Sequence, residues 1–512
     1  MRDRLLDAAG PGLALGGAMG LLLVASRGGL GVAPDSVVYL DGARALARGA
    51  GYVTRTAGQL QPITHFPPLY SALLAVTSTL AAPLAAARLL ALALRAALLV
   101  IVWLGLTRVA RLGRLACALA LGLIAVSPEL TLVHATVYSE PLYFAASVSG
   151  LFLLAAFLQG NERRALLASS ILLAAATLTR YVGISLLGAA FVVLVARRGR
   201  PLKARLGDTA TFAGVAGTPL LLWYLRNMAV APGPGISAAD RTLALHLPAL
   251  QDWGQGAASL SHWLVPQAVP ALAGGAVVMA GSALLLVRAA ARVRACSLRE
   301  RLAPPMCAVP FLAAAFSYLA LVVAARSVAD ALIPFDGRML SPAYVLLVIG
   351  ATAACSIDGV LGVSGRRVAV ALAAVLIGLG ARRAYRAAVE MPEGRRYAGP
   401  QYARMAIEVS AYQSRAEFTN DPWFVVFAFD RPVRPLPQRY SPFSLVPNPR
   451  FLDEVRAVCR ELARTGGAVL FVRSEPRGRP WEVRLGELMA TGHLRSEAEG
   501  AAWMVLAPGS CD

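Results

Sequence analysis

Charged side chains that could take part in chemistry lie at the ends of long apolar stretches of this sequence. A carboxylate in such a place can accept a proton from a hydroxyl group, and a guanidinium can bind two oxygens of one phosphate. Burying an arginine beside hydrocarbon is costly, so an arginine in an apolar stretch is informative about function. The residues of these kinds are Asp35, Glu140, Arg88, Arg95, Arg180 and Arg338.

Each of these residues also has a purely structural interpretation. Asp35 could act only as the N-cap of a helix over residues 36–46, because Asp is a favoured capping residue. Glu140 precedes Pro141 and could cap the apolar segment that follows. The arginines could anchor lipid headgroups or pair with acidic residues, for which the candidates are Asp330, Asp336 and Glu140.

The composition indicates a protein embedded in a membrane. Of the 512 residues 57% are hydrophobic and 15% are charged, and a soluble protein of this length could not bury so much apolar surface. The 49 basic residues outnumber the 29 acidic ones, which gives a net charge of +20. In a membrane protein this excess favours cytoplasmic loops beside anionic lipid over a surface for nucleic acid, so we expect no nucleic-acid partner.

Apolar stretches close to the length of about 20 residues that a spanning helix requires predict about eleven transmembrane helices. The segment 67–84 is also apolar, but it opens with Pro67 and Pro68 and contains Pro83, and we interpret it as a juxtamembrane segment at the interface. The predicted spans are residues 10–26, 86–106, 114–128, 140–158, 164–179, 182–196, 208–226, 268–288, 305–325, 339–357 and 366–382.

The basic clusters predict the orientation of these spans. If segment 67–84 does not cross, all of the clusters face the cytoplasm, as the positive-inside rule requires, and if it crosses, all of them are translocated. We therefore predict a multi-pass protein of the inner (plasma) membrane with a cytoplasmic N-terminus and an extracytoplasmic C-terminal domain. The clusters lie at residues 108–114, 163–164, 197–205, 288–301 and 366–367.

This topology exports residues 27–66, 227–267 and 383–512 and leaves 1–382 as the transmembrane domain. Function is expected on the exported segments. The tail becomes abruptly more polar, and its pattern predicts a small α/β domain. Its helices are expected near 400–417, 450–464 and 481–491, and its strands at 423–430, 468–473 and 501–508.

The six cysteines give little support to a metal site. None belongs to a CxxC pair or lies near a histidine at ligand spacing. Cys459 and Cys511 fall in the predicted external domain, where a disulfide could form, but the connectivity cannot be read from the sequence.

The first exported segment contains a recognisable motif. Residues 34–52 read PDSVVYLDGARALARGAGY, and residues 62–70 read PITHFPPLY. This combination resembles the bacterial membrane glycosyltransferases of the protein O-mannosyltransferase type (glycosyltransferase family 39-like) in the GT-C superfamily, which include the lipid A aminoarabinose transferases. The resemblance covers the first 200 residues well and continues in LTRYVG at 178–183 and GRMLSP at 337–342. It implies a GT-C-like fold, α-helical and polytopic.

The resemblance implies a transferase that moves a sugar from a polyprenyl-phosphate donor to a hydroxyl of a glycan, lipid or protein acceptor, with inversion, on the extracytoplasmic face. It implies that Asp35 is the catalytic base. Because the leaving group is already a phosphate, one carboxylate suffices, whereas a glycoside hydrolase needs a pair flanking the bond. It also implies that Glu140 is a second catalytic residue that reaches the same cavity and that Arg180 and Arg338 bind the phosphate.

Some expectations for the same site are less specific. Many members of the family carry a second acidic residue after the first, but Ser36 occupies that place here. We therefore assign no metal ligand, although a divalent metal stays open, and we expect Asp41 to be solvated or paired with Arg44. A transporter or flippase of lipid-linked or glycan substrates is the alternative function, but no clear internal repeat supports it. The further substrate-binding residues that we expect are Tyr39, His65 and Arg88.

Overall fold

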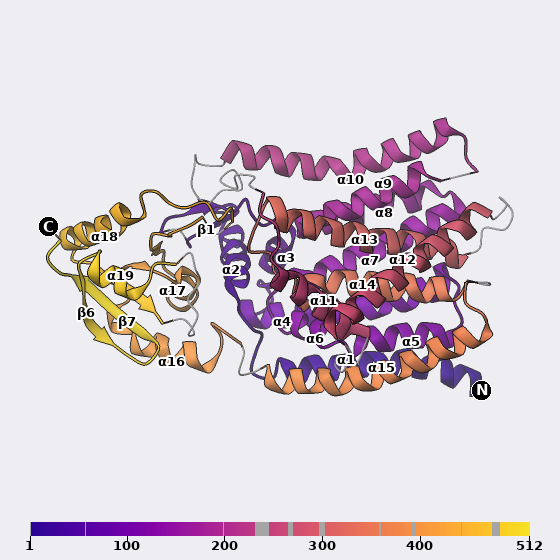
Figure 1. Ribbon diagram of the computed structural model, residues 1–512, viewed down its shortest axis with the longest axis horizontal. Coiled ribbons are helices and arrows are strands. Elements are labelled where there is room, and N and C mark those ends of the chain that lie inside the picture. Colours follow the sequence, from indigo (N-terminus) through magenta and orange to yellow (C-terminus); the bar gives the residue numbers. More distant parts are fainter. Residues whose placement is uncertain are drawn as a thin grey trace.

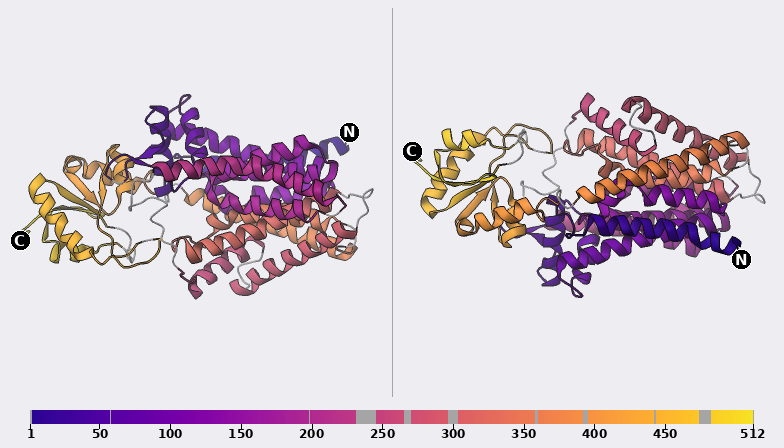
Figure 2. Two further views of the ribbon diagram at one scale, coloured as in Figure 1. Left: turned by 90° about the horizontal axis from the view of Figure 1, so that it is seen from above. Right: turned by 90° about the horizontal axis from the view of Figure 1, so that it is seen from below.

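The protein is a bundle of helices with a smaller α/β domain at one end (Figure 1). The computed structural model describes residues 2–56, 58–197, 199–230, 245–264, 270–295, 303–357, 360–391, 395–441, 443–473 and 482–511. The C-terminus belongs to the α/β domain, and the N-terminus lies at the opposite end of the bundle (Figure 1, Figure 2). The predicted fold class, a helical polytopic protein with a small C-terminal α/β domain, is confirmed.

Every apolar stretch predicted as a span is helical in the structure. Among the described residues, six helices are long and apolar enough to cross a bilayer, and α5 with α6, bent by 58°, adds a seventh if the pair is one broken span. The prediction of about eleven crossings stays a prediction. The helices of the bundle are α1 (Arg2–Ala25), α4 (Pro83–Leu104), η1 (Gly105–Val109), α5 (Arg114–Ala125), α6 (Pro128–His134), α7 (Glu140–Gly160), α8 (Arg163–Thr179), η2 (Tyr181–Gly183), α9 (Ile184–Val195), α10 (Leu202–Val230), α11 (Leu250–Leu264), α12 (Ala271–Ala295), α13 (Ala303–Val328), α14 (Gly337–Cys355) and α15 (Val363–Glu390).

The segment 67–84 does not form a spanning helix. Its helix α3 (Leu69–Thr77) has nine residues, fewer than half of the about 20 that a bilayer crossing requires. Pro83 then occupies the first turn of α4, where a proline is tolerated because its missing N–H would have no intrahelical partner. A break therefore separates α3 from α4, as the prolines predicted.

Basic loops predicted to face the cytoplasm lie at the end of the bundle away from the α/β domain (Figure 1). Arg197, between α9 and α10, donates to the carbonyl oxygen of Leu158 near the end of α7 at 2.7 Å. Arg288 of α12 donates to the carbonyl oxygen of Val360, between α14 and α15, at 2.7 Å. These bonds bring connections that are far apart in the sequence together, whereas residues 296–302 lie outside the described part of the chain.

The predicted long loop 227–267 contains a helix that the sequence did not reveal. This helix, α11, packs against α12 and α14, and the ring of its buried Trp263 lies 5.3 Å from the ring of Tyr344. A helix of 15 residues is only marginally stable alone, so packing of one face stabilises it. Residues 231–244 and 265–269 of the predicted loop lie outside the described ranges.

Segment 27–66, which the sequence predicts to be exported, is packed at the end of the bundle that faces the α/β domain (Figure 1). Its helix α2 (Pro34–Ala47) begins with a proline in the first turn and lies against α3, with its first half buried. The strands β1 (Val53–Thr54) and β2 (Gln61–Pro62) then form an antiparallel pair. The segment with the motif residues is therefore held in a fixed position.

The C-terminal domain is built on a sheet with helices around it. In the described residues the strand order is β4-β3-β5-β7-β6, in which β3 is parallel to β4 and β5 and the other pairs are antiparallel. A disulfide joins Cys459 to Cys511, the pairing that the sequence left open. α15 runs to residue 390, so the bundle extends past the predicted boundary at 382. The elements are α16 (Pro400–Glu408), η4 (Ser410–Tyr412), β3 (Ala416–Thr419), α17 (Pro422–Phe429), β4 (Arg434–Pro435), α18 (Phe451–Thr465), β5 (Ala468–Val472), α19 (Leu485–Ala490), β6 (Leu494–Glu499) and β7 (Trp503–Pro508).

The predicted strand 423–430 is wrong, because these residues form the helix α17. The carboxylate of Asp421 accepts a hydrogen bond from the backbone N–H of Phe424, and Pro422 occupies the first turn. Both features start a helix. The apolar run was therefore compatible with either structure, and the residues before it decided the outcome.

Two predicted helices of this domain are shorter in the structure, and three strands were missed. α16 ends at Glu408, before the predicted end at 417, and α19 covers only the middle of 481–491. The missed strands are β3, β4 and β6, of which β3 and β4 have only four and two residues. In β6 only Leu494 is fully buried. It pairs at the edge of the sheet with β7, so it has no alternating apolar pattern to predict it.

An ion-pair network holds the C-terminal domain against α2. Arg55 binds Asp41 of α2, 3.0 Å from Nε to Oδ1, and Asp430 at the end of α17, 2.7 Å from Nη2 to Oδ1. Arg44 pairs with Asp430 at 3.0 Å, and Thr54 donates to Asp41. The expectation of a solvated Asp41, or one paired with Arg44, is wrong because the β1–β2 hairpin folds back over α2 and buries it.

Replacing Asp430 with asparagine is expected to weaken this contact between the domains. The hydrogen bond from Arg55 holds the pKa of Asp430 below its ordinary value of 3.8. The pair therefore stabilises the fold fully above that value, and the stabilisation is lost as the pH falls through the lower folded-state pKa. Because the Asp430 side chain is 51% exposed, we expect a loss of at most about 1 kcal/mol, measured as a fall in the thermal unfolding midpoint at neutral pH.

A control variant separates this contact from a general effect of surface charge. Asp453→Asn removes an exposed pair with Arg456 on α18, and it is expected to leave the unfolding midpoint unchanged. If Asp430→Asn behaves like this control, or if its effect persists unchanged in acid, the network does not hold the domains together.

Candidate active site

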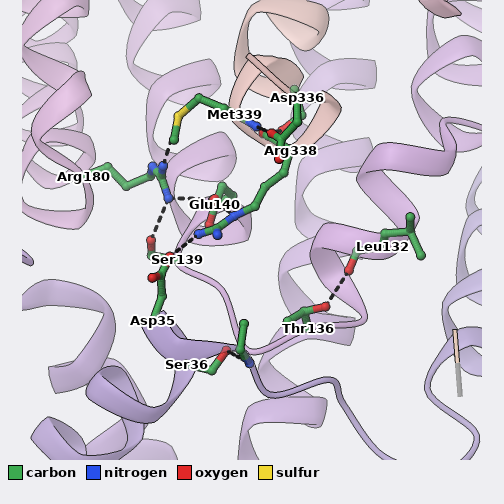
Figure 3. Close-up of polar contacts among 12 residues, drawn as sticks. Asp35, Ser36, Leu132, Thr136, Ser139, Glu140, Arg180, Asp336, Arg338 and Met339 are labelled. Carbon is green, nitrogen blue, oxygen red and sulfur yellow. Dashed lines mark hydrogen bonds and ion pairs between the residues drawn. The ribbon is translucent and has the colours of Figure 1, made fainter. Parts of the chain in front are cut away.

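Four of the charged residues predicted from the sequence meet at the end of the bundle near the C-terminal domain (Figure 3). Nη2 of Arg338 lies 2.7 Å from Oδ2 of Asp35, and Nε of Arg338 lies 2.7 Å from Oε1 of Glu140. Nη1 of Arg180 lies 2.7 Å from the same oxygen of Glu140. Two guanidinium groups and two carboxylates therefore form one continuous cluster.

Helix termini position the four side chains. Glu140 begins α7, Arg338 lies in the first turn of α14, and Arg180 directly follows α8. Asp336 caps α14 by accepting a backbone hydrogen bond at 2.8 Å, which fixes the turn that carries Arg338. Arg180 leaves its helix in an extended conformation before the short helix η2. Because α8 ends where α7 and α14 begin, the three side chains share one end of the bundle.

The carboxylate of Glu140 is compensated by two arginines. Its side chain is 0% exposed, while those of Arg180 and Arg338 are 12% and 25% exposed. Arg180 also donates to Oγ of Ser139 at 3.3 Å. Removing an ionised carboxylate from water costs several kcal/mol unless it is paired and hydrogen-bonded. Glu140 therefore holds the two arginines in one place, and they make its burial tolerable.

The guanidinium of Arg338 is also held by an aromatic ring. Its central carbon lies 3.6 Å from the centroid of the Tyr138 ring, a cation–π contact. Burial raises the pKa of Tyr138 to about 12, so its phenol stays protonated at neutral pH. Nε and Nη2 of Arg338 bind carboxylates, and Nη1 makes no hydrogen bond to the part of the chain that the structure describes. One donor nitrogen is therefore available to a ligand.

Asp35 is not the N-cap of α2, contrary to the structural interpretation of the sequence. The cap residue is Ala33, whose backbone N–H donates to Oγ of Ser36 at 3.0 Å. Burial raises the pKa of Asp35, but its ion pair and hydrogen bond with Arg338, with the charge of Arg180, hold that pKa below its ordinary value. Asp35 is therefore ionised at neutral pH and able to accept a proton.

Tyr39 and His65, which the sequence also predicted, lie beside the cluster. Tyr39 is one turn after Asp35 on α2, and its Oη lies 3.0 Å from Oγ of Ser139. The ring of Phe66 lies 4.8 Å from that of Tyr39 and 4.5 Å from that of His65. The motif residues of segment 27–66 therefore form one packed group.

The chain that carries His65 is fastened to α10 by a hydrogen-bond network that the sequence did not reveal. Oη of Tyr181 donates to the carbonyl oxygen of Thr64 at 2.6 Å. Nε1 of Trp223 and Nδ2 of Asn227 donate in turn to Oη of Tyr181, at 2.8 and 3.1 Å. Tyr181 belongs to the LTRYVG motif, but its partners on α10 are 42 and 46 residues away, so no local pattern signals them.

A cavity of about 660 Å³ opens beside the cluster. One wall carries the motif residues, a second is apolar and comes mainly from α13 and the chain after it, and a third belongs to the C-terminal domain. Such a cavity suits an amphipathic ligand. The first wall includes Asp35, Tyr39, His65, Arg180 and Arg338, the second Leu321, Val322, Ala325, Leu332, Ile333, Val182 and Ile184, and the third Asn420, Trp423, Pro435, Pro437, Gln438 and Phe443.

Other residues singled out by the sequence lie elsewhere. Arg88, expected to bind substrate, donates to Oγ of Ser26 at 3.2 Å and is not among the described residues that line the cavity. Arg95 is buried and donates to backbone carbonyls at the end of α5. Helical spacing placed the arginines on one face, but it could not show which helix that face contacts.

The described residues contain no group of three or more His, Cys, Asp or Glu side chains that could hold a metal ion. Asp35 and Glu140 pair with arginine, and Ser36, which replaces the second acidic residue of the motif, binds the backbone of Ala33. The expectation of a divalent metal therefore stays untested, and no role below depends on one.

Comparison with known proteins identifies the fold. No known protein-family model matches the sequence, and no curated protein matches it. The chain is similar to the structure of ArnT from Cupriavidus metallidurans bound to undecaprenyl phosphate, with a TM-score of 0.57 and 14% identity over 97% of both chains. It is also similar to the arabinofuranosyltransferase AftD from Mycobacteria, with a TM-score of 0.53 and 15% identity over 98% of this chain and 40% of AftD. The GT-C fold that the motifs implied is confirmed over nearly the whole chain.

Proposed function

We propose that this protein is a membrane glycosyltransferase that moves a sugar from a polyprenyl-phosphate donor to an acceptor hydroxyl. The observation that carries the proposal is the cluster of Asp35, Arg180 and Arg338 beside a cavity with an apolar wall. Such a cavity can take a phosphate and a hydrocarbon chain side by side. ArnT, which has the same fold, was solved with undecaprenyl phosphate, a molecule of this kind.

The donor phosphate is assigned to the arginines. Arg338 has Nη1 available, and a guanidinium binds phosphate through donors in a fixed plane. The polyprenyl chain is assigned to the wall formed by α13 and η2, where burial of hydrocarbon contributes about 0.8 kcal/mol per CH₂ group. The affinity for the donor would then come mainly from its lipid chain. Arg180 and Arg338 would position the bond between the sugar and the phosphate, which breaks in the reaction.

Asp35 is assigned the role of general base. It takes the proton of the acceptor hydroxyl as the hydroxyl oxygen attacks the anomeric carbon. The bond from that carbon to the phosphate oxygen breaks, and its electron pair leaves with the phosphate, where Arg180 and Arg338 stabilise the charge. Direct displacement inverts the configuration at the anomeric carbon.

In this mechanism, donor binding also increases the basicity of Asp35. Without donor, Arg338 pairs with Asp35, and this pair lowers the tendency of the carboxylate to take a proton. A donor phosphate competes for the same guanidinium, which weakens the pair and makes Asp35 a stronger base. The carboxylate would then become reactive only when a donor is in place.

We assign the site to the extracytoplasmic face of the inner membrane, with the N-terminus in the cytoplasm. Basic loops lie at the opposite end of the bundle, where the positive-inside rule would place the cytoplasm (Figure 1). The C-terminal domain near the site has the disulfide Cys459–Cys511, and disulfides persist in oxidising compartments outside the cytoplasm. Both observations support the same orientation.

The test is donor turnover by the reconstituted full-length protein with a panel of radiolabelled undecaprenyl-phosphate sugars. At least one donor is expected to release undecaprenyl phosphate. Arg338→Gln is expected to weaken the binding of this donor tenfold or more, because a hydrogen bond to a charged group contributes about 1.5–3 kcal/mol. Arg163→Gln, at an exposed arginine on the other end of the bundle, serves as the matched control.

Two results would contradict the proposal. Equal donor affinity in Arg338→Gln and Arg163→Gln would remove Arg338 from the donor site. Movement of the intact lipid-linked sugar across the bilayer, without release of undecaprenyl phosphate, would favour a flippase.

A further inference from the structure

The C-terminal domain closes one side of the site cavity. Trp423 in the first turn of α17, Pro435 and Pro437 around β4, Gln438 and Phe443 all line it. These residues come from a part of the chain far from the motif segments. Because the opposite wall carries the base and the arginines, this wall is placed to face whatever molecule supplies the attacking hydroxyl.

The charge of the cavity disfavours an anionic acceptor. Its described arginines, Arg180 and Arg338, lie on the wall of the motif residues and pair with carboxylates, and the proposed function assigns their remaining donor capacity to the donor phosphate. On the wall from the C-terminal domain, the described charged residue is Glu482, and no described lining residue of the cavity is a lysine. A phosphorylated or carboxylated acceptor would therefore lose its hydration without gaining a cation.

The same wall is also unsuited to an extended peptide. Peptides commonly bind a sheet by adding a strand to its edge through backbone hydrogen bonds. Here the edge strand is β4, where Pro435 and Pro437 have no N–H to donate. The N–H of Leu436 between them already donates to the carbonyl oxygen of Thr419 at 2.8 Å. Residues 435–437 therefore offer a peptide no free backbone N–H.

Two other side chains of this wall could bind a ligand: the aromatic ring of Trp423 and the side-chain amide of Gln438. The indole Nε1 of Trp423 makes no hydrogen bond within the described part of the chain, and the ring is only partly buried. An exposed ring face suits the C–H face of a sugar ring, and a side-chain amide such as Gln438 can bond to hydroxyl groups. Asn420 is excluded from this role, because both polar atoms of its amide bind the backbone of Val472.

The side chain of Trp423 is packed against α2, the helix that carries Asp35. Trp423 packs against a cluster that includes Val38 of α2 and Tyr52, and Val38 lies one turn after Asp35. The distance between the indole ring and the carboxylate is therefore set by contacts within the folded protein. A sugar stacked on Trp423 would present its hydroxyl groups at a defined place relative to Asp35.

We propose that the acceptor is an uncharged carbohydrate that stacks on Trp423, so that one of its hydroxyl groups reaches Asp35. This inference rests on the proposed function and narrows it from any hydroxyl acceptor to a neutral glycan. In the step, the glycan hydroxyl oxygen forms the new bond to the anomeric carbon, its proton goes to Asp35, and the phosphate leaves with the electron pair of the broken bond.

The test measures two reactions of the full-length protein in nanodiscs with a radiolabelled undecaprenyl-phosphate sugar. One is slow hydrolysis of the donor without acceptor, and the other is transfer to acceptors. The neutral acceptors are isomaltopentaose, mannopentaose and arabinopentaose, and the comparison acceptors are lipid A and a peptide rich in serine and threonine. Transfer is expected to at least one neutral saccharide and to neither of the comparison acceptors.

Variants of Trp423 then test whether the acceptor stacks on this side chain. Trp423→Ala is expected to lower kcat/KM for the saccharide at least tenfold more than it lowers donor hydrolysis, and Trp423→Phe is expected to restore most of the transfer. Retained donor hydrolysis shows that a variant is folded. If lipid A or the peptide is the acceptor, if no neutral saccharide accepts, or if Trp423→Ala transfers normally, the inference is overturned. Absence of donor turnover in the native protein would instead count against the proposed function.

Discussion

Replacing Asp35 with asparagine is expected to lower sugar transfer by about 10²–10⁴-fold, the usual contribution of a general base. Asparagine keeps the size of the side chain and can still accept a hydrogen bond from Arg338, but it cannot take a proton at neutral pH. Donor binding is therefore expected to persist while the chemical step fails. The measurement is single-turnover transfer in reconstituted membranes with donor affinity measured separately.

A second carboxylate in the same cavity gives the matched control for this variant. Asp330 lines the cavity and accepts a backbone hydrogen bond from Leu332 at 2.9 Å. Asp330→Asn removes one negative charge from the same space, and transfer is expected to change less than threefold. If both variants lose transfer equally, the net charge of the cavity matters and Asp35 has no special role.

The pH dependence of transfer provides an independent readout of Asp35. Its pKa lies below the ordinary value of 3.8, so transfer is expected to fall only as the pH drops through that lower value and the carboxylate gains a proton. Burial raises the pKa of Asp35, and Arg338 opposes it. Arg338→Gln should therefore move the acid limb of kcat/KM to higher pH, and an unmoved limb would mean that another group limits the rate.

Much of the fold followed from the lengths of apolar runs, because a lipid environment requires helices whose backbone hydrogen bonds are internal. The same criterion failed where an apolar run was short. Residues 423–430 fit a strand or a buried helix equally, and only the capping residue Asp421 and Pro422 favour the helix α17. In the C-terminal domain, capping chemistry was therefore more informative than hydrophobicity.

The candidate site was predictable where its residues lie at helix ends inside short motifs. Asp35, Glu140, Arg180 and Arg338 are all of this kind, and they meet in one cluster. Arg88 is different, because its position within a span says only which face it occupies, and that face contacts Ser26, directly after α1. A motif position therefore carried more information about the site than a charge within an apolar helix.

Contacts between distant segments were beyond the reach of the sequence. Asp41 was expected to be solvated or paired with Arg44, three residues away, but the hairpin brings Arg55 onto it, and Asp430 of the other domain binds Arg55 as well. Trp423 reaches the cavity through the same docking of the two domains. The spacing of residues along the sequence does not predict such contacts, since they depend on how separate helices and strands pack.

Replacing Glu140 with glutamine is expected to destabilise the protein by about 3 kcal/mol or more, the usual cost of breaking a buried ion pair from one side. Glu140 is 0% exposed and binds both Arg180 and Arg338. Without its charge, two guanidinium groups would stay close together with only Asp35 to compensate them. The free energy of unfolding in nanodiscs is the measurement, with Glu129→Gln as control, because the carboxylate of Glu129 accepts a hydrogen bond from Ser127 and has no described arginine partner.

A double variant distinguishes charge compensation from a defect in packing. Arg180→Met removes one of the two unbalanced charges, so Glu140→Gln with Arg180→Met is expected to be less destabilised than the sum of the two single variants. If the two losses are simply additive, Glu140 and Arg180 do not compensate each other, and the buried carboxylate must owe its stability to something else. If instead the double variant recovers stability but still fails to bind donor, the cluster has two separable roles: Glu140 keeps the arginines together in the folded protein, and the arginines hold the phosphate.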